Sequence, residues 1–200
     1  MDSKREDTTP PPSRCPPDRD ALRRDMVAAR RALPAATVAA WSAQIVAHLL
    51  ARFARPPGAC VAFCWPIQHE PDVRAALAAW ARQGSRAALP VVIAPGKPLG
   101  FRPWARDTRL EPDRYGIPTP VTGPWVRPDA LLLPLNAFDA AGYRLGYGGG
   151  FFDRTLASLD PRPLAIGVGF ELNRVESIGP QAHDQPLDWI VTEAGCFRPR

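Results

Sequence analysis

The strongest constraint on the fold is a glycine-rich segment, RLGYGGGFFDR, at residues 144–154, which places four glycines in five consecutive positions. It follows the apolar run Asp129–Leu133, typical of a strand covered on both faces, and precedes a helical pattern over Phe151–Leu159. In open α/β sheets, ligands bind beyond the carboxyl ends of strands, where loops meet helix N-termini. Free N–H groups at such a terminus attract phosphate, and glycines let the backbone approach it closely. The segment therefore predicts a phosphate-binding loop.

The spacing within this segment excludes two common nucleotide motifs. A dinucleotide fingerprint that starts at Gly146 needs glycine at position 151, where Phe151 stands, and a P-loop would end in Gly-Lys-Ser/Thr, which is absent. From the residues alone, a tight irregular turn stays open as an alternative. In that interpretation Asp153 only stabilises the N-terminus of the following helix.

The rest of the chain alternates between strand-like and helical patterns. We expect helices over Asp18–Leu33, Ala35–Phe53 and Asp72–Gln83, and strands over Ala59–Cys64, Arg86–Ile93, Gly100–Trp104, Leu164–Phe170 and near Trp189–Thr192. This alternation predicts a mostly parallel α/β sheet with helices on both sides. The length of 200 residues favours one domain, over residues 18–200, and the polar, proline-rich residues 1–17 predict a disordered tail.

Composition limits the class of partner. The net charge is +5, but the basic residues are scattered and lack interleaved aromatics, so we expect no nucleic-acid partner and favour an anionic small molecule. No run approaches the roughly 18 apolar residues of a membrane span, and no apolar leader is present, so we expect a cytoplasmic protein without a membrane partner. We expect the four cysteines to be reduced and buried as apolar side chains.

Five segments, in order along residues 18–194, carry a resemblance to a known family. They are Arg19-Asp-Ala-Leu22-Arg23, Pro66-Ile-Gln-His-Glu70-Pro-Asp72, Gly116-Ile-Pro-Thr-Pro120, Phe138-Asp139 through Asp153, and His183-Asp184-Gln-Pro-Leu-Asp188. Together they resemble the motifs of the 5-formyltetrahydrofolate cyclo-ligase (5,10-methenyltetrahydrofolate synthetase) family. The resemblance implies a single three-layer α/β/α domain with a mostly parallel central sheet and N-terminal helices.

The activity that the resemblance implies is the ATP- and Mg²⁺-dependent cyclisation of 5-formyltetrahydrofolate to 5,10-methenyltetrahydrofolate. ATP phosphorylates the formyl oxygen, and ADP and phosphate are released. The implied partners are small molecules, with ATP as co-substrate and Mg²⁺ as cofactor, and we expect a monomer. The alternative is a non-catalytic folate- or nucleotide-binding relative of the enzyme, against which the retained acids Asp153 and Asp184 argue.

The resemblance also assigns roles to individual residues. It implies Arg144 and Asp153 as catalytic residues, and Asp153 and Asp184 as magnesium ligands, which suits a cation that prefers oxygen. The ATP-binding residues would be Arg19, Arg23, Arg144, Gly146, Tyr147, Gly148, Gly149, Gly150, Phe151 and Phe152. The folate-binding residues would be Trp65, Glu70, Tyr115 and Phe152.

Taken without the resemblance, four of these residues have simpler interpretations. Arg23 would lie on a solvated helix face, Asp184 would be a turn residue, Tyr115 would be a core aromatic, and Glu70 would be a solvated loop acid or a helix cap.

Three departures from the family pattern affect the expected site. Arg19 replaces a lysine with a larger planar guanidinium, and Gly149 stands where some relatives have lysine. Phe151 and Phe152 replace two tyrosines, so ring stacking can persist there while any hydroxyl contact is lost.

Overall fold

The apolar runs of the chain form the strands of one seven-stranded sheet in the computed structural model, which describes residues 17–200. The strands are β1 (Cys60–Phe63), β2 (Arg86–Val91), β3 (Gly100–Trp104), β6 (Ala130–Pro134), β9 (Leu164–Val168), β10 (Trp189–Thr192) and β11 (Gly195–Phe197), in the order β11-β10-β9-β6-β1-β2-β3. The five strands from β10 to β2 are parallel, and the edge strands β3 and β11 are antiparallel to their neighbours. The prediction of a mostly parallel sheet is confirmed.

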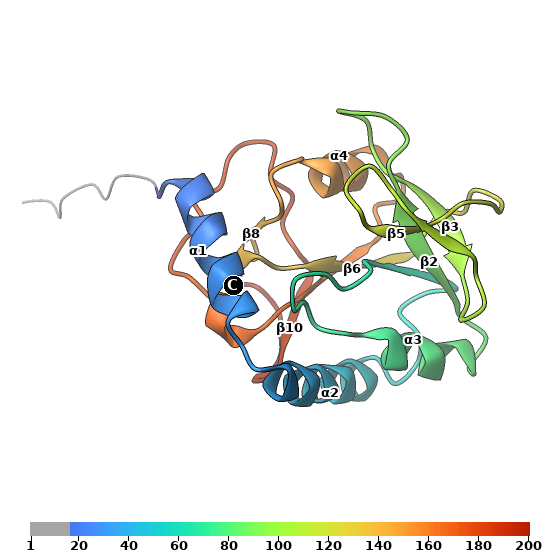
Figure 1. Cartoon of the computed structure of the whole chain (residues 1–200), viewed down its shortest axis with the longest axis horizontal. Helices are drawn as coiled ribbons and strands as arrows, with labels where there is room; N and C mark the ends of the chain where they lie inside the picture. The colour runs from blue at the N-terminus through green and yellow to red at the C-terminus, as the bar shows by residue number, and fades with distance from the viewer. Residues whose placement is uncertain (1–16) are drawn as a thin grey trace, which may run out of the picture.

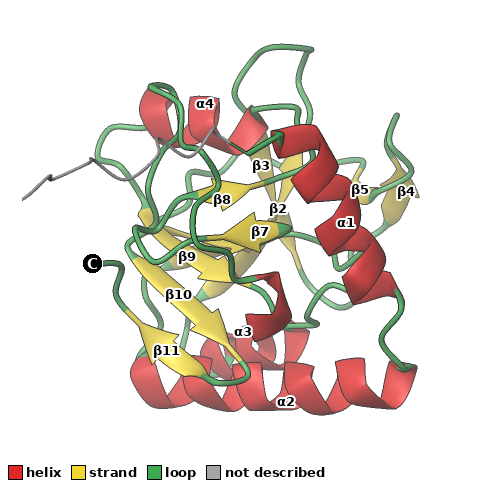
Figure 2. Ribbon diagram, turned by 90° about the vertical axis from the view of Figure 1, so that its left-hand side faces the viewer, coloured by secondary structure: helices red, strands yellow, loops and turns green. Residues whose placement is uncertain are grey.

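Helices cover both faces of this sheet, as predicted. They are α1 (Arg19–Arg31), α2 (Ala35–Arg52), α3 (Arg74–Ala81), α4 (Phe151–Ser158) and the short 3-10 helix η1 (Glu171–Asn173). Figures 1 and 2 show α2 and α3 on one face and α4 on the other, which gives three layers. Helix α1 stands beside the sheet and packs against η1.

Two apolar layers hold the helices to the sheet, because successive residues of a strand point to opposite faces. Val61 and Phe63 of β1 belong to the cluster that includes Leu49 of α2 and Trp80 of α3. Ala62 belongs to the opposite cluster, with Leu156 of α4. All four residues of β1 are buried, which explains why its sequence reads as a continuous apolar run.

The structure corrects several predicted boundaries. Cys64 lies beyond β1, β2 ends at Val91, before Ile93, β9 ends at Val168, before Phe170, and α3 begins at Arg74 rather than Asp72. Asp72 stays outside α3 because its carboxylate accepts a hydrogen bond from the Arg74 N–H at 3.0 Å. Asp18 is not part of α1 but its N-cap, since its carboxylate accepts hydrogen bonds from the N–H groups of Asp20 and Ala21.

Five strands of two or three residues were not predicted. They are β4 (Leu110–Pro112) and β5 (Pro118–Pro120), which form a hairpin in a proline-rich stretch, β7 (Ala137–Phe138) and β8 (Arg144–Leu145), which form a second hairpin, and the edge strand β11. Strands of two or three residues carry too little periodicity to be recognised.

The described residues bear on two predictions, the absence of a membrane span and the burial of reduced cysteines. Within residues 17–200, no single helix has the length and apolarity to cross a membrane, and α1 and α2 would reach that threshold only as a pair bent by 103°. Cys60 is buried, whereas Cys64 and Cys196 are only partly buried, and these three form no disulfide. Cys15 and the tail predicted at residues 1–17, apart from Pro17, lie outside the described residues.

Candidate active site

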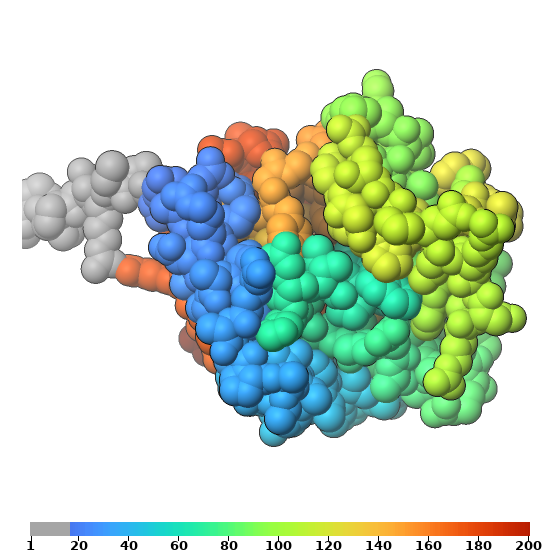
Figure 3. Space-filling model, in the orientation of Figure 1, coloured from blue at the N-terminus to red at the C-terminus, as the bar shows by residue number. Residues whose placement is uncertain are grey.

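A cavity of about 1020 Å³ opens at the carboxyl ends of β1 and β6, where the topology predicts a ligand. Its walls come from the start of α1, the segment after β1, residues 113–119, the glycine segment and residues 179–184. In Figure 3 a hollow lies where the orange glycine segment meets the yellow-green segment. Every residue that the sequence assigned to ATP, folate or magnesium lines this one cavity.

The glycine loop, residues 146–150, joins β8 to α4. Gly148 (φ +91°) and Gly150 (φ +62°, the N-cap of α4) adopt left-handed backbone conformations that strain residues with a Cβ. Arg154 donates to the Gly149 carbonyl at 2.5 Å and stacks on Phe151, so the loop is held from the helix behind it. The N-terminus of α4 therefore faces the cavity with no side-chain cap over its N–H groups.

Arg144 and Asp153 face each other at the two ends of this loop. Arg144 is 5% exposed, and its Nη2 lies 3.2 Å from Asp153 Oδ1 while its Nη1 donates to the Gln185 carbonyl at 2.8 Å. Desolvation lowers the pKa of Arg144, and the charge of Asp153 opposes this. The cation and the acid thus neutralise one another on the cavity wall.

Arg19 and Asp184 form a second ion pair across the cavity mouth. Arg19 donates through Nη1 to Oδ2 at 2.6 Å and through Nη2 to Oδ1 at 3.0 Å, which is the bidentate geometry that arginine favours. Asp184 also accepts from the Gln181 N–H at 2.7 Å, as a turn residue would. Desolvation tends to raise the pKa of Asp184, but the Arg19 and Gln181 hydrogen bonds outweigh it, so the pKa is lowered.

Arg23 does not lie on a solvated helix face. Its Nε donates to the Gly146 carbonyl at 2.7 Å, and its guanidinium packs beside Gly148. It also pairs with Asp20 on α1, an exposed acid. Arg23 therefore attaches α1 directly to the glycine loop.

Glu70 is a buried acid, 6% exposed, and neither a solvated residue nor a cap of α3. Gln68 and His69 before it are both left-handed (φ +49° and +59°), an uncommon backbone that turns Glu70 into the cavity wall. Its Oε2 accepts from the Ile67 N–H at 3.1 Å and its Oε1 accepts from the Tyr147 hydroxyl at 2.6 Å. Desolvation raises the pKa of Glu70, although the charge of Arg30 and these two donors oppose the increase.

Arg30 is a site residue that sequence reasoning missed. It is 1% exposed and donates to the carbonyls of Gln68 and Leu135, to Asn136 Oδ1 and to the Tyr147 hydroxyl. Its Nη2 also lies 3.6 Å from Glu70 Oε1. The signal was its spacing, seven residues after Arg23, which places both on one face of α1.

A match to a family model decides the identity of the fold. The model of the 5-formyltetrahydrofolate cyclo-ligase family matches residues 16–193, most of the chain. The chain belongs to this family.

Individual cyclo-ligases are similar to parts of the chain. The 5-formyltetrahydrofolate cyclo-ligase of Escherichia coli K12 is 35% identical over 119 residues, which cover 56% of this chain and 65% of the relative. That of Haemophilus influenzae is 35% identical over 95 residues, 44% of this chain and 51% of the relative. The chain thus spans between half and two thirds of the length of these curated relatives.

Solved structures of the family match over more of the chain. The NMR structure of Aquifex aeolicus 5,10-methenyltetrahydrofolate synthetase superposes with a TM-score of 0.78 at 28% identity and covers 91% of this chain and 93% of its own. The structure of a 5,10-methenyltetrahydrofolate synthetase from Mycoplasma pneumoniae has a TM-score of 0.72 at 23% identity, covering 88% of this chain and 99% of its own, which shows a shared fold.

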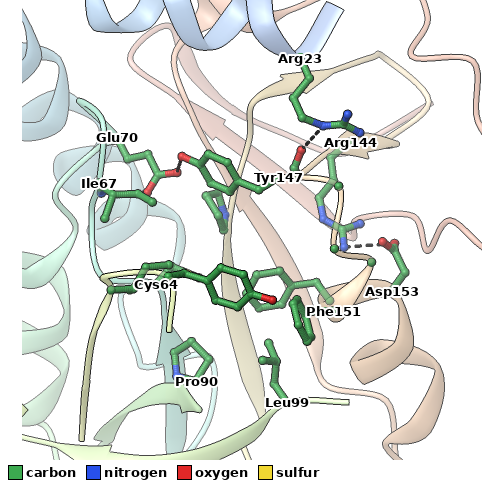
Figure 4. Close-up of a pocket in the computed structure, with 18 of the residues that line it drawn as sticks. Arg23, Cys64, Ile67, Glu70, Pro90, Leu99, Arg144, Tyr147, Phe151 and Asp153 are labelled. Carbon is green, nitrogen blue, oxygen red and sulfur yellow. Dashed lines mark hydrogen bonds and ion pairs between the residues drawn. The ribbon is translucent and has the colours of Figure 1, made fainter. Parts of the chain in front are cut away.

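Aromatic side chains form the remaining wall of the cavity. Tyr115 is 54% exposed, so it is not a core aromatic, and its ring meets Phe151 edge-on at 6.2 Å between centroids. Trp65 is partly buried, lies under the Arg74 guanidinium and meets Trp104 at 6.2 Å. Phe152 also lines the cavity and is packed against the α4 side of the core. Figure 4 shows Phe151 of this aromatic wall, and Glu70 and Tyr147, which point toward one another.

Of the two acids that the sequence assigned to magnesium, Asp153 has the more accessible carboxylate. Within residues 17–200, no three His, Cys, Asp or Glu side chains gather into a metal cluster. Asp153 Oδ1 accepts from the Gln185 N–H at 3.0 Å, but no described residue donates to its Oδ2, whereas both oxygens of Asp184 are bonded to Arg19. Mg²⁺ commonly takes one or two carboxylates, substrate phosphates and waters, so the donor chemistry of Asp153, beside the glycine loop, fits this cation.

Proposed function

We propose that this family member is an ATP- and Mg²⁺-dependent enzyme that cyclises 5-formyltetrahydrofolate to 5,10-methenyltetrahydrofolate. One observation carries the proposal: the cavity has a glycine loop with Arg144 and Asp153 on one side and the buried acid Glu70 on the other. The first side suits a triphosphate and the second suits the N–H donors of a pterin. A volume of about 1020 Å³ is at the upper end of single-ligand pockets, consistent with two substrates held together.

The chemistry that we assign needs positioning and charge neutralisation. The formyl oxygen attacks the γ-phosphorus of ATP and ADP leaves, which converts that oxygen into a phosphate ester, a good leaving group. The N10 lone pair then attacks the formyl carbon, N10 loses its proton, and the carbon–oxygen bond breaks to release phosphate. Phosphoryl transfer of this kind depends on alignment and electrostatics more than on covalent participation of the protein.

The loop side of the cavity would hold the nucleotide. The N–H groups of residues 146–152 at the start of α4 would surround phosphate oxygens, and Arg144, already buried at this wall, would neutralise charge on the transferred group. Arg19 and Arg23 would reach the triphosphate from α1. Since Arg19 is paired with Asp184 and Arg144 with Asp153, phosphate binding would exchange an aspartate partner for a phosphate partner.

The acids released by this exchange would face the cation. We assign Asp153 to Mg²⁺ through its open Oδ2, and Asp184 as a second ligand once Arg19 turns to phosphate. When bound, Mg²⁺ supplies positive charge that offsets the charge of the phosphate oxygens.

The opposite side of the cavity would hold the folate. As a carboxylate, Glu70 can accept hydrogen bonds from the pterin amino and ring N–H groups. Trp65, Tyr115 and Phe152 would pack on the flat ring system. No step needs a protein nucleophile, and Cys64 on this wall is unsuited to be one, because desolvation raises the pKa of its thiol well above the usual range.

The deciding experiment measures methenyltetrahydrofolate formation by absorbance, with ATP and Mg²⁺ added together or singly. We expect turnover only when both are present. Equal turnover without ATP would overturn the proposal, and tight binding of both ligands without turnover would favour the non-catalytic relative. Monomeric state and the absence of a nucleic-acid partner stay predictions, tested by solution mass and by the salt dependence of any DNA or RNA binding.

A further inference from the structure

Tyr147 stands at the boundary between the two sides of the cavity. The residue is 44% exposed and lines the cavity, but its hydroxyl is hydrogen-bonded to buried side chains. The hydroxyl donates to Glu70 Oε1 at 2.6 Å and accepts from Arg30 Nη2 at 2.9 Å. Figure 4 shows this contact bridging the glycine loop and the segment after β1. A residue of the loop therefore orients the acid of the opposite wall.

The same contact closes a ring of interactions through α1. Arg23 holds the loop backbone at the Gly146 carbonyl, one residue before Tyr147, and Arg30, two turns further along α1, holds the Tyr147 hydroxyl. Arg30 also donates to the carbonyl of Gln68 at 3.0 Å, in the strained turn that precedes Glu70. The loop and the turn of Glu70 are thus tied to each other and to one helix, so a shift of either one moves the Tyr147–Glu70 contact.

The hydrogen-bonding capacity of Glu70 leaves room for a ligand. Each carboxylate oxygen can accept two hydrogen bonds, and each oxygen of Glu70 accepts one from the chain, at Tyr147 or at Ile67. Glu70 lines the cavity, so a ligand there can use the remaining acceptor sites. Without the Tyr147 hydroxyl, Glu70 Oε1 would lose its shortest contact and could turn toward Arg30, whose Nη2 is 3.6 Å away.

We propose that Tyr147 is a positioning residue that couples the two binding sites: its hydroxyl orders Glu70 when the glycine loop is ordered by a nucleotide, so that nucleotide binding strengthens folate binding. The identity of the two ligands rests on the function proposed above. The coupling arises because loop and acid are ordered together, so the ligand that binds second meets a site that is already arranged. Reciprocity requires folate to strengthen nucleotide binding by the same factor.

The test measures the dissociation constant of 5-formyltetrahydrofolate by calorimetry, with and without saturating ADP, which cannot phosphorylate the substrate. We expect ADP to tighten folate binding to the full chain by a factor of about 5 to 150, the usual range for coupled sites. In Tyr147→Phe this factor should fall close to one. The matched control is Tyr143→Phe, which removes a hydroxyl four residues earlier, outside the cavity lining, and should keep the original factor.

A second variant separates positioning from folding. In the Glu70→Gln background, Tyr147→Phe should raise the folate KM little further, because its effect passes through Glu70. A general loosening of the loop would instead raise the folate KM by the same factor as in the unmodified chain. The coupling is overturned if ADP tightens folate binding to Tyr147→Phe as much as to the unmodified chain. It is also overturned if ADP does not tighten folate binding to the unmodified chain, and either result leaves the proposed cyclisation intact. Coupled binding with no turnover would instead overturn the proposed reaction alone, and absence of folate binding would overturn both.

Discussion

Arg144 and Asp153 lie 3.2 Å apart, Nη2 to Oδ1, at opposite ends of the glycine loop, so a buried arginine depends for its charge balance on the acid in the first turn of α4. Asp153 uses only one of its carboxylate oxygens for these contacts. Its Oδ1 holds Arg144 and the Gln185 N–H, and no described residue donates to its Oδ2. A change at Asp153 should therefore affect cation dependence as well as the position of Arg144.

Asp153→Asn should reduce turnover at least about tenfold and raise the Mg²⁺ concentration needed for half-maximal rate. The amide keeps an acceptor for the Gln185 N–H but removes one anionic ligand from a hard cation. Turnover measured against Mg²⁺ concentration, beside the thermal midpoint of the same preparation, checks this. Asp107→Asn, at an exposed position, is the control for loss of charge. If Asp153 only favours the helix N-terminus, stability falls by about 0.3–1 kcal/mol and activity persists.

Arg19→Ala should lower the free energy of unfolding by about 1.5 kcal/mol at neutral pH, the low end for a hydrogen bond to a charged group, because the Arg19 side chain is 19% exposed. The pKa of Asp184 is lower in the folded protein than the unfolded value of about 3.9. The Asp184 carboxylate therefore adds to the free energy of unfolding above the unfolded pKa, and this addition is lost as pH falls through the folded pKa. The variant should therefore lose less stability on acidification. Urea unfolding across pH 3–7, with the exposed Arg24→Ala as control, measures this; parallel acid profiles would contradict it.

Glu70→Gln should raise the folate KM by about 10- to 150-fold, corresponding to roughly 1.5–3 kcal/mol for a lost charged partner, and change the ATP KM far less. Because the folded pKa of Glu70 is raised, the acid becomes neutral as pH falls through a value above 4.5, and the folate KM should rise there. The Gln variant should lack this pH dependence. Kinetics with each substrate varied in turn, and Glu111→Gln as an exposed control, decide the point. An unchanged folate KM removes Glu70 from the site.

A chain that begins at Pro17 should keep its turnover, because the polar, proline-rich composition of the preceding residues offers little apolar surface for a core. Pro17 and Asp18 are kept because both line the cavity, and Asp18 caps α1. Activity and solubility of the shortened and full chains can be compared directly. A large loss of either would show that the removed residues contribute to the domain.

The central sheet was predictable because buried parallel strands leave a strong local signal. The sequences of β1, β6 and β9 are apolar on both faces, and the glycine segment marks the start of α4. The hairpin of β4 and β5 gives no such signal, because its short strands contain prolines. Its pairing depends on where the rest of the fold places the two strands. The boundary of α3 likewise depends on one side-chain contact, from the Arg74 N–H to Asp72.

The members of the candidate site were predictable from motifs, but their partners were not. Sequence placed Arg19, Glu70 and Asp184 in one site, yet nothing local indicates that Arg19 pairs with Asp184 or that Tyr147 contacts Glu70. Arg30 was overlooked because a charged residue in an amphipathic helix is usually solvated. Its burial follows from the way α1 lies against the loops, a property of the whole fold.

The Arg19–Asp184 pair joins side chains that are 165 positions apart, and this has a consequence for how the protein acquires its cavity. Contacts of such sequence separation form late, since the entropy of closing a long loop opposes them until other structure has shortened it. During synthesis, at roughly 5–20 residues per second, the strands β1, β2 and β6 leave the ribosome well before Asp184 does. The ion pair at the cavity mouth therefore cannot form until residue 184 has been translated, and a nascent chain stalled before this residue should lack this part of the site.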